Sequence, residues 1–521
     1  MSVENLFPGV YVEEIPLAST GIAGAETSIT AFVGNTLMGP SGIPVYISGI
    51  EEYQRIYGGL ALDSMLSYAV QDYFRNGGRK AVILRLTGIG AKKAVLSLPC
   101  STNPVEALQL EATSEGAWGN ELSVQILRTE RGRKQLFSLR KKPTKDGRFE
   151  VNIFLQGKLE ETFSSVSLIP GDAAFLPAML EANSRLLRVL KTGSSWTLPP
   201  QNPLYTLQAV SAAGGQDGTA LRPEDYLGDQ AAETGIYALK KANLFNLLCI
   251  PPPQRGGDTD ITVYRAALKL CVERRAVLLV DAPSSWTGSA ISNISGAEEL
   301  LGIQGPDTRN AAVYFPRLLK SDALQKGQTE VFVPCGAVAG IIAAIDERRG
   351  VWKAPAGAEA VLKEVIALQH DIPEGLMSQI NAAGINNIRK TADQGIILWG
   401  ARTLRGSDRY ADEYKYLSVR RTALYIEESV LRGTQWVIFE QNDEALWQKL
   451  RLQADDFLMN LFRAGAFQGN RPDLAYFVKC GRDTTTQQEL DNGYLNLLIG
   501  FAPLKPAEFL LINIKHKLHF P

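Results

Sequence analysis

The sequence predicts a multidomain α/β protein that carries a mostly β insertion and an α+β block near its carboxyl end. The chain has 521 residues, and a single domain usually has about 100–200. Short continuous apolar runs alternate with helical patterns on both sides of a stretch in which apolar and polar residues alternate with a period of two. Continuous apolar strands separated by helices are typical of a parallel sheet covered on both faces.

The composition argues against several classes of protein. The chain has 54 Lys+Arg and 55 Asp+Glu, so its net charge of −1 argues against a general nucleic-acid binder. Its five cysteines form no close pair, which argues against a disulfide framework and favours a reducing compartment. No apolar run reaches the roughly 18 residues of a membrane helix, and the first 16 residues lack the basic segment of a signal peptide. We therefore expect a soluble protein that assembles in the cytoplasm and does not insert into a membrane.

The amino terminus, residues 1–25, is expected to form an extended arm. Pro8-Gly9 breaks the chain, and a nearly alternating run then continues to Ile15 before Pro16. A short extended segment at a terminus is unstable alone and must add to a sheet. That sheet can belong to another subunit or to the arm's own domain. The expected strand includes Val10, Tyr11, Val12, Glu13 and Ile15.

An α/β core is expected in residues 26–90 and 216–370. Strands are indicated at five apolar runs, residues 29–34, 81–86, 246–250, 276–281 and 312–315. Asp63 or Ser64 can cap a helix that ends before Gly77. Further helices are indicated near residues 230–242, 261–275 and 336–348.

Residues 91–215 have a different pattern and are expected to form a β-rich insertion domain. Residues 108–112, 122–127 and 149–154 alternate apolar and polar side chains, as strands with one face in water do. Seven Lys and Arg residues lie between positions 131 and 145. We interpret this basic run as a solvated hairpin or loop rather than as a binding patch.

The last part of the chain is expected to form an α+β domain, residues 371–505, followed by a second arm, residues 506–521. Strands are indicated at residues 395–400, 435–440, 475–478 and 496–500. Asn442 or Asp443 can cap a long helix. The terminal run is strongly β-forming and includes Phe509, Leu510, Leu511, Ile512 and Ile514.

The side chains that catalysis or metal binding would need are scarce. The chain has three histidines, and two of them, His516 and His519, lie in its last six residues. His370 is therefore left for a Ser-His-Asp arrangement, and neither G-x-S-x-G nor the phosphate-binding G-x-x-x-x-G-K-[ST] occurs. The nearest cysteines, Cys249 and Cys271, are too far apart in the sequence for a zinc motif. We expect no catalytic, cofactor or metal site, and we interpret His370 as a surface or capping residue.

Several different short motifs are distributed along most of the chain. The amino-terminal half supplies residues 8–14, 30–34, 39–40, 74–81 and 116–120, and the carboxy-terminal block supplies residues 399–404, 419–421, 426–429, 435–437, 439–443, 484–486 and 506–509. Together these segments resemble the contractile tail sheath family of myophages, R-type bacteriocins and extracellular contractile injection systems. The resemblance covers nearly the whole chain and is weakest in residues 120–215.

The resemblance implies a core of the kind often called subtilisin-like, here without the catalytic triad. It implies neighbouring sheath subunits, with or without paralogues, that polymerise around an inner tube protein and meet baseplate and terminal cap proteins. Contraction of the sheath drives the tube through a target envelope. The particle is a phage tail or a tail-like particle that is released or stays anchored, and no nucleic acid or cofactor takes part. The moderate length and compact insertion favour a bacteriocin or an injection system over a phage.

The two arms then acquire a role. We hypothesise that residues 10–15 and 509–514 insert as strands into adjacent subunits and form a mesh that survives contraction. Contraction needs no nucleotide if the extended polymer is metastable and its subunits bury more interface in a second packing.

By the same resemblance the carboxy-terminal domain faces the tube, and the helix of about residues 443–464 is the candidate contact. Its exposed face would present Lys449, Arg451, Asp455 and Asp456. The alternative is a helix that is committed wholly to its own core and to solvent.

Two other functions stay open. A hydrolase of subtilisin-like or other α/β architecture would need a base and a nucleophile elbow that the sequence does not supply, and a serine-directed probe would detect it. A non-contractile binding or scaffold protein would differ from a sheath subunit in forming no tubes.

Overall fold

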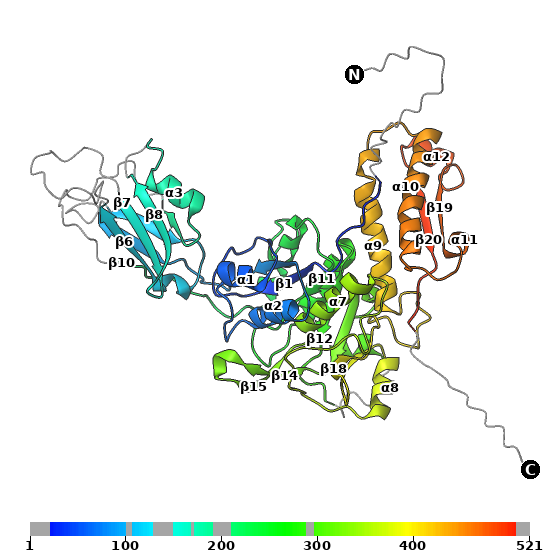
Figure 1. The fold of residues 1–521 in the computed structure, drawn as a ribbon, viewed down its shortest axis with the longest axis horizontal. Helices are drawn as coiled ribbons and strands as arrows, with labels where there is room; N and C mark the ends of the chain where they lie inside the picture. Colours follow the sequence, from blue (N-terminus) through cyan, green and yellow to red (C-terminus); the bar gives the residue numbers. More distant parts are fainter. Residues whose placement is uncertain are drawn as a thin grey trace, which may run out of the picture. The chain divides into compact units, whose positions relative to one another are not determined.

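The structure is a computed structural model that describes residues 21–99, 107–128, 149–167, 171–190, 210–287 and 296–506. The chain forms two compact units, whose folds are drawn in Figure 1. Of the described residues, the core unit contains those within 26–421 together with 505–506. The C-terminal unit contains residues 422–504 together with 21–25. The domain boundaries expected from the sequence stay a prediction.

An eight-stranded sheet forms the centre of the core unit. Its six inner strands are parallel, and an antiparallel strand lies at each edge. The strand order is β18 (Gly395–Leu398), β17 (Asn386–Thr391), β13 (Ala311–Phe315), β12 (Val277–Asp281), β11 (Leu247–Cys249), β1 (Thr30–Gly34), β3 (Ala81–Arg85) and β2 (Val45–Ile47). The sequence prediction of a largely parallel α/β sheet is confirmed.

The strands that the sequence predicts are the deeply buried ones. Every residue of β1, β3, β12 and β13 is buried, as expected for inner strands of a sheet covered on both faces. The sequence does not predict β17, whose residues are mostly polar. Its Asn386 is buried, and the side-chain Nδ2 donates to the carbonyl groups of Val313 (3.1 Å) and Arg402 (2.8 Å).

Helices cover this sheet. Ser64 caps α2 by accepting a hydrogen bond from the Ser67 backbone N–H (3.3 Å), as the sequence predicts. The connections β1–α2–β3 and β11–α5–β12 run in opposite directions along the sheet, so right-handed crossovers place α2 and α5 on opposite faces. The helices here are α1 (Ile50–Tyr57), α2 (Met65–Arg75), α4 (Pro223–Leu227), α5 (Ile261–Glu273), α6 (Ala297–Leu301), α7 (Cys335–Arg349) and α8 (Glu374–Ala382), with 3-10 helices η2 (Gly235–Lys241), η3 (Pro306–Asn310) and η4 (Ala323–Gln325).

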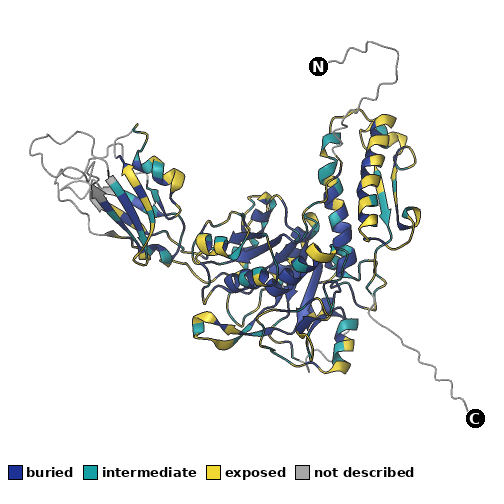
Figure 2. Cartoon of the chain, viewed as in Figure 1, coloured by how far each residue is buried: buried dark blue, intermediate teal, exposed yellow. Residues whose placement is uncertain are grey.

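Helix α7 packs directly against the backbone of α2. A Cβ atom on Gly336 would lie 2.1 Å from the carbonyl oxygen of Ala69, and one on Gly340 would lie 2.5 Å from that of Tyr73. The missing side chains at these two positions let the helices approach, while other residues of α7 contact β11 and β12. Figure 2 shows that the buried residues concentrate in this sheet and the helices packed on it.

A small sheet, in the order β15 (Gln328–Phe332), β14 (Leu318–Asp322) and β16 (Ala367–Leu368), is attached to the same region. Lys320 of β14 forms a buried ion pair with Asp72 of α2. The side chains of Lys320 and Asp72 are 6% and 4% exposed, so removing one of them would leave a buried charge unpaired. This pair fixes β14 to α2.

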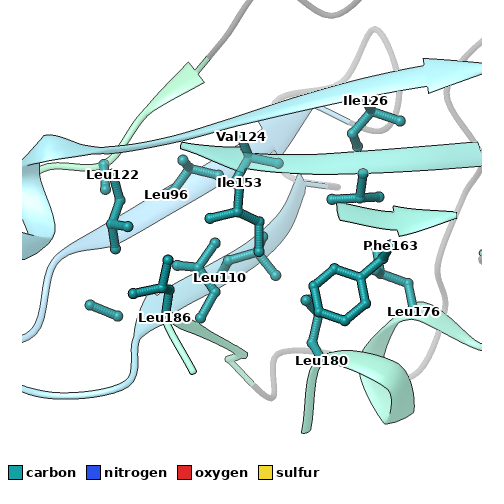
Figure 3. Close-up of a cluster of buried hydrophobic side chains, with 14 of the residues drawn as sticks. Leu96, Leu110, Leu122, Val124, Ile126, Ile153, Phe163, Leu176, Leu180 and Leu186 are labelled. Carbon is teal, nitrogen blue, oxygen red and sulfur yellow. The ribbon is translucent and has the colours of Figure 1, made fainter. Parts of the chain in front are cut away.

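The insertion has a hydrophobic core of its own. One sheet has the order β10 (Val210–Ser211), β6 (Leu122–Arg128), β7 (Phe149–Leu155) and β8 (Lys158–Val166), and the other β4 (Val95–Pro99), β5 (Ala107–Ala112) and β9 (Leu187–Val189). Side chains of both sheets, with those of α3 (Leu176–Asn183), form one cluster (Figure 3). A short 3-10 helix, η1 (Ala117–Glu121), precedes β6. The expected β-rich character is therefore observed, and the basic run 131–145 lies outside the described residues.

The C-terminal unit contains a helical pair and a two-stranded sheet. Helix α9 (Leu417–Gly433) begins in the core unit and continues into this one. Asp443 caps α10 by accepting a hydrogen bond from the Leu446 N–H (2.9 Å), as one of the two predicted caps. The remaining elements are η5 (Gln435–Val437), α10 (Glu444–Arg463), α11 (Pro472–Ala475), β19 (Tyr476–Cys480), α12 (Gln487–Asp491) and β20 (Leu497–Phe501).

The strand expected at residues 435–440 is wrong. This run forms η5 and a turn, in which the Val437 N–H donates to the Thr434 carbonyl (3.0 Å). Trp436 packs against the cluster of Leu446, Trp447 and Leu450 on α10. Contacts with a helix thus override the β propensity of an aromatic and β-branched run.

Because α7 and α2 touch at Gly340, we expect any side chain at this position to destabilise the fold. In Gly340→Ala the new Cβ would meet the Tyr73 carbonyl oxygen and the Asn76 Cβ, 2.5 and 2.7 Å away. We expect the free energy of unfolding to fall by about 1–3 kcal/mol, measured by urea unfolding followed by circular dichroism. Gly375→Ala in α8 is the matched control, because a Cβ there has no atom within 4 Å. Equal stability of the two variants would contradict the close packing.

Candidate assembly surfaces

The two-stranded sheet of the C-terminal unit has one face on α10 and one face toward solvent. Strands β19 and β20 are antiparallel, with Tyr476 opposite Phe501 and Cys480 opposite Leu497. In the part of the chain that the structure describes, each strand pairs with the other alone. Each therefore has a second edge of backbone N–H and C=O groups on which another strand can pair. Two strands are also too few for a sheet to be stable without further packing or pairing.

The outer face of this sheet is partly apolar. Phe477 of β19 is 48% exposed and Leu498 of β20 is 50% exposed. Side chains of an added strand would continue this face and cover part of it. The sheet thus offers backbone pairing at its edges and apolar contact beside them.

The described residues of the amino-terminal arm, residues 21–25, run along α9. The Ala25 N–H donates to Ser429 Oγ (2.9 Å), and Ile22 is buried against Gly433 at the end of the helix. Gly24 lies against Tyr425, where a Cβ atom would be 2.2 Å from the hydroxyl oxygen. The absence of a side chain at Gly24 thus permits this close contact. The described part of the chain therefore begins beside the carboxyl end of α9.

The other terminus leaves the C-terminal unit at the opposite end. Pro503 forms a β-bridge with Phe467, which follows the carboxyl end of α10. Helices α9 and α10 lie side by side (Figure 1), and the rings of Tyr425 and Phe457 are 6.0 Å apart. They are antiparallel, and a helix of the length of α10 spans about 30 Å. Within the C-terminal unit, Ile22 and Pro503 therefore lie about one helix length apart.

Helix α10 presents a polar face on the side away from its core. Its buried residues include Leu446, Leu450, Phe457 and Leu461. The exposed Lys449 places its Nζ 4.1 Å from the ring centroid of Trp436. That cation–π contact leaves the ammonium group accessible to a partner.

The other three predicted contact residues differ in their hydrogen bonds within the unit and in their exposure. Arg451 donates from Nη1 to the Cys480 carbonyl (2.6 Å) and from Nη2 to Glu444 (2.9 Å), and it is half-buried. Asp455 accepts a hydrogen bond from the Tyr476 hydroxyl (3.1 Å). Asp456 is exposed. Lys449 and Asp456 are therefore the better candidates for contact with another protein, and the role of all four residues stays a prediction.

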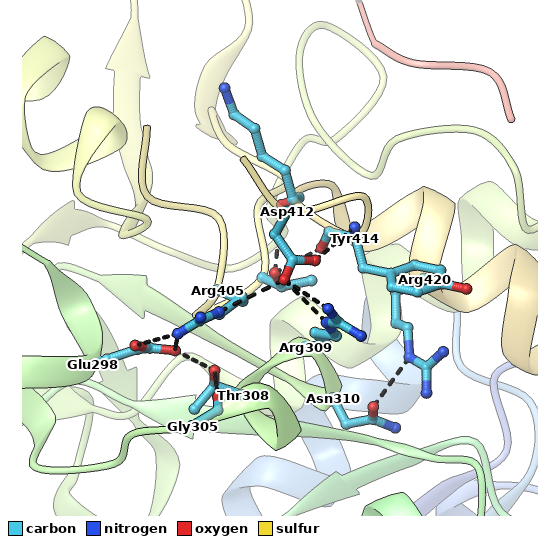
Figure 4. Close-up of polar contacts among 11 residues, drawn as sticks. Glu298, Gly305, Thr308, Arg309, Asn310, Arg405, Asp412, Tyr414 and Arg420 are labelled. Carbon is cyan, nitrogen blue, oxygen red and sulfur yellow. Dashed lines mark hydrogen bonds and ion pairs between the residues drawn. The ribbon is translucent and has the colours of Figure 1, made fainter. Parts of the chain in front are cut away.

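In the core unit, a polar network holds the segment that precedes α9 (Figure 4). Arg405 donates to both carboxylate oxygens of Glu298 (3.2 and 3.4 Å) and forms an ion pair with Asp412 (3.6 Å). Arg420 in the first turn of α9 donates to Asn310 (3.0 Å). The Glu298 and Asp412 side chains are only 2% and 6% exposed. Such buried pairs fix the start of α9 against η3 and α6.

The motif at residues 399–404 has a structural explanation in the same region. Arg402 is 1% exposed and donates to the Gly406 carbonyl (3.1 Å) and to Asp408 (2.9 Å). Its backbone N–H donates to Asn386 Oδ1 of β17 (2.7 Å). The motif therefore joins the sheet edge to the loop before α9. Sequence spacing gives no sign of these partners.

A second buried polar group lies where β12 ends and α7 begins. Asp281 Oδ1 accepts a hydrogen bond from the Cys335 backbone N–H (3.0 Å), while its Oδ2 has no hydrogen-bond partner among the described residues. Burial raises the pKa of Asp281 from its ordinary 3.8 to about 6. Burial also raises the thiol pKa of Cys249 and of Cys335. Both thiols therefore stay protonated and are poor nucleophiles near neutral pH.

His370, the histidine singled out by the sequence, lies in an aromatic contact. Its ring stacks on Phe315 at the end of β13, with the centroids 6.1 Å apart. Within the described ranges no group of three His, Cys, Asp or Glu side chains is placed to bind a metal ion. No helix in these ranges is long and apolar enough to cross a bilayer.

Comparisons with known proteins identify a domain and a fold. Residues 411–517 match the sequence model of the phage tail sheath C-terminal domain. No curated protein matches the sequence. The structure is similar to the contracted PVC sheath of an extracellular contractile injection system, with 19% identity, 99% of each chain covered and a TM-score of 0.57.

Two further solved structures have the same fold. The contracted helical sheath of the anti-feeding prophage is 20% identical over 99% of this chain and 100% of its own, with a TM-score of 0.55. The sheath tail protein of Listeria innocua is 12% identical over 92% of this chain and 96% of its own, with a TM-score of 0.60. The resemblance to the tail sheath family is confirmed for residues 411–517, and the multidomain α/β fold predicted from the sequence is confirmed by the solved structures. The subtilisin-like description of the core stays a prediction.

The buried Asp281 predicts an unusual pH dependence. Its pKa is higher in the folded chain than in the unfolded chain, so ionisation costs folding free energy above about pH 6 and costs none below about pH 4. Asp281→Asn should therefore be more stable than the native chain at pH 8, by at most about 3 kcal/mol. The advantage should shrink as the pH falls toward 4 in urea unfolding curves.

Asp260→Asn is the control for this pH series. Asp260 is an exposed helix cap whose hydrogen bonds with Thr262 lower its pKa, and asparagine caps equally well. Relative to the native chain, this variant should gain no stability as the pH rises. An Asp281→Asn variant that is less stable than the native chain at pH 8 would show that the carboxylate is stabilising.

Proposed function

We propose that this chain, which carries the carboxy-terminal domain of the phage tail sheath family, is a structural subunit of a contractile sheath. Many copies would polymerise helically around an inner tube, and shortening of the polymer would drive the tube through a target envelope. The observation that carries the proposal is the sheath domain itself, which contains an open two-stranded sheet. A structural role is also supported by the similarity to sheath proteins.

The arms are proposed to link the subunits. Residues 10–15 and 509–514 lie outside the described residues, and their sequences predict strands. We place one arm from each of two neighbours on the edges of β19 and β20, where strand addition supplies main-chain hydrogen bonds. Because Ile22 and Pro503 lie at opposite ends of the C-terminal unit, the arms that continue from them are suited to reach different neighbours. Head-to-tail contacts of this kind generate an open helical polymer rather than a closed dimer.

The energy of contraction is proposed to reside in the polymer. An extended lattice that is metastable can shorten when its subunits adopt a second packing with more buried interface. Strand exchange suits such a change, because the hydrogen bonds of an added strand stay within one small sheet while the rest of the subunit moves. No nucleotide enters this scheme.

Contact with the inner tube is assigned to α10. Lys449 and Asp456 supply exposed charges of both signs, which suits a contact that must release when the tube slides. Baseplate and terminal cap proteins are the further partners of the proposal. The particle would assemble in the cytoplasm and be released or anchored afterwards.

Removing the amino-terminal arm tests the proposed linkage. Deletion of residues 1–16 should leave a folded monomer that no longer forms striated tubes, because one edge of each two-stranded sheet loses its added strand. Negative-stain electron microscopy and size-exclusion chromatography, each with and without added tube protein, measure the outcome. Tubes of normal appearance from the deleted chain would refute the role of the arm, and a native chain that coats no tube protein would refute the sheath assignment.

The tube contact is tested by single charge changes on α10. Lys449→Glu and Asp456→Lys should each lower the amount of tube protein that co-purifies several-fold without unfolding the subunit. Lys449→Glu also loses the contact with Trp436, which at an exposed site is worth about 0.5–1 kcal/mol of stability. The matched control is Lys269→Glu, a change at an exposed lysine of α5 in the core unit. Unchanged co-purification of both α10 variants would remove α10 as the tube contact.

A further inference from the structure

The chain passes between the core unit and the C-terminal unit at residues 25/26, 421/422 and 504/505. On the core side, the first passage continues into residues 26–30, and the second is preceded by the first turn of α9, residues 417–421. We name these two segments the roots. Both roots are bound by one side chain, the carboxylate of Asp346 in the last turn of α7.

The second root is held by a bidentate ion pair. Arg421 donates from Nη1 to Oδ1 of Asp346 (2.8 Å) and from Nη2 to Oδ2 (2.5 Å). The two side chains are 3% and 2% exposed. Paired parallel hydrogen bonds fix the orientation of the guanidinium group as well as its distance. Loss of the carboxylate would leave a buried arginine without its counter-charge, which is strongly destabilising.

The first root is held at Ser28. Its hydroxyl donates to Oδ2 of Asp346, and its φ of 71° is a left-handed conformation that serine rarely adopts. The Tyr73 hydroxyl donates to the Ser28 carbonyl (2.9 Å), and the Ile29 N–H donates to Asn246 Oδ1 (2.9 Å). The surroundings thus hold the backbone of Ser28 in a conformation that a free chain would avoid.

Asp346 is well placed to act as a fixed point. It belongs to α7, the helix whose backbone is held against α2 at Gly336 and Gly340. The neighbouring Glu347 has a different setting, because it forms an ion pair with Arg79 in which both side chains are largely exposed. The buried carboxylate is therefore distinct from the surface charges of the same turn.

We propose that Asp346 is an anchor that fastens both roots to α7 and transmits force from them to this helix. A pull that enters the core unit along the backbone at 25/26 or 421/422 passes through these roots, and Asp346 passes it to α7, which packs on the central sheet. The anchoring belongs to the single chain, whereas the load during contraction rests on the proposed function.

Hydrogen exchange on the full-length monomer tests the anchoring. In Asp346→Asn, peptides that cover residues 26–30 and 417–421 should exchange at least about tenfold faster than in the native chain, because a buried ion pair is broken. Peptides of β12 should keep the native rate. Glu347→Gln is the matched control and should leave both roots unchanged. Native exchange at both roots of Asp346→Asn would overturn the proposal.

Two milder variants separate the branches and keep the test valid if Asp346→Asn does not fold. Ser28→Ala should accelerate exchange at residues 26–30 alone, and Arg421→Lys should accelerate it at residues 417–421 alone. Acceleration at neither segment, or equally throughout the core, would overturn the anchor. These readouts use the monomer, so they stand even if the native chain makes no sheath.

The role of Asp346 in transmitting force during contraction is tested on assembled sheaths. Sheaths of Asp346→Asn, or of Arg421→Lys if the former does not fold, should break or stop short when native sheaths are triggered to contract. Shortening to the native length with intact subunits would overturn this part, even where the exchange result upholds the anchoring.

Discussion

The contact between the backbones of α2 and α7 is the constraint on which the rest of the core depends. Gly336 and Gly340 allow the two helices to touch, and this places both ends of α7. At its first residue, the Cys335 N–H meets Asp281 at the end of β12. In its last turn, Asp346 meets Ser28 and Arg421. One helix thus connects the strands of the sheet with the segments that lead out of the core unit.

The C-terminal unit follows the opposite principle, because its sheet is left open. Two strands with apolar residues such as Phe477 and Leu498 on the outer face gain from further strands. A subunit built in this way combines a closed core with an unfinished sheet that neighbours can complete. In the proposed sheath, neighbouring core units change how they pack against one another, while the completed sheets keep their hydrogen bonds. Shortening therefore need not break the polymer.

The sequence predicts the elements whose pattern of apolar residues directly reflects which faces are buried. Strands such as β1 and β12 are buried on both faces and give continuous apolar runs, and the spacing along α10 places Lys449 and Asp456 on its exposed face. The run at 435–440 has a similar composition but packs on α10, so its pattern misleads. Spacing also cannot show that Arg451 is bound to a carbonyl 29 positions away, or that Asp346 binds partners 75 and 318 positions away. These roles depend on tertiary contacts that leave no local pattern.

The most direct test of strand exchange between subunits is a cryo-electron microscopy reconstruction of the chain assembled on its tube protein, in the extended and contracted states. We expect each two-stranded sheet of β19 and β20 to carry added strands, formed by residues 10–15 of one neighbour and residues 509–514 of another, in both states. Arms that pair within their own subunit, or a polymer in which the edges of β19 and β20 stay unpaired, would contradict strand exchange.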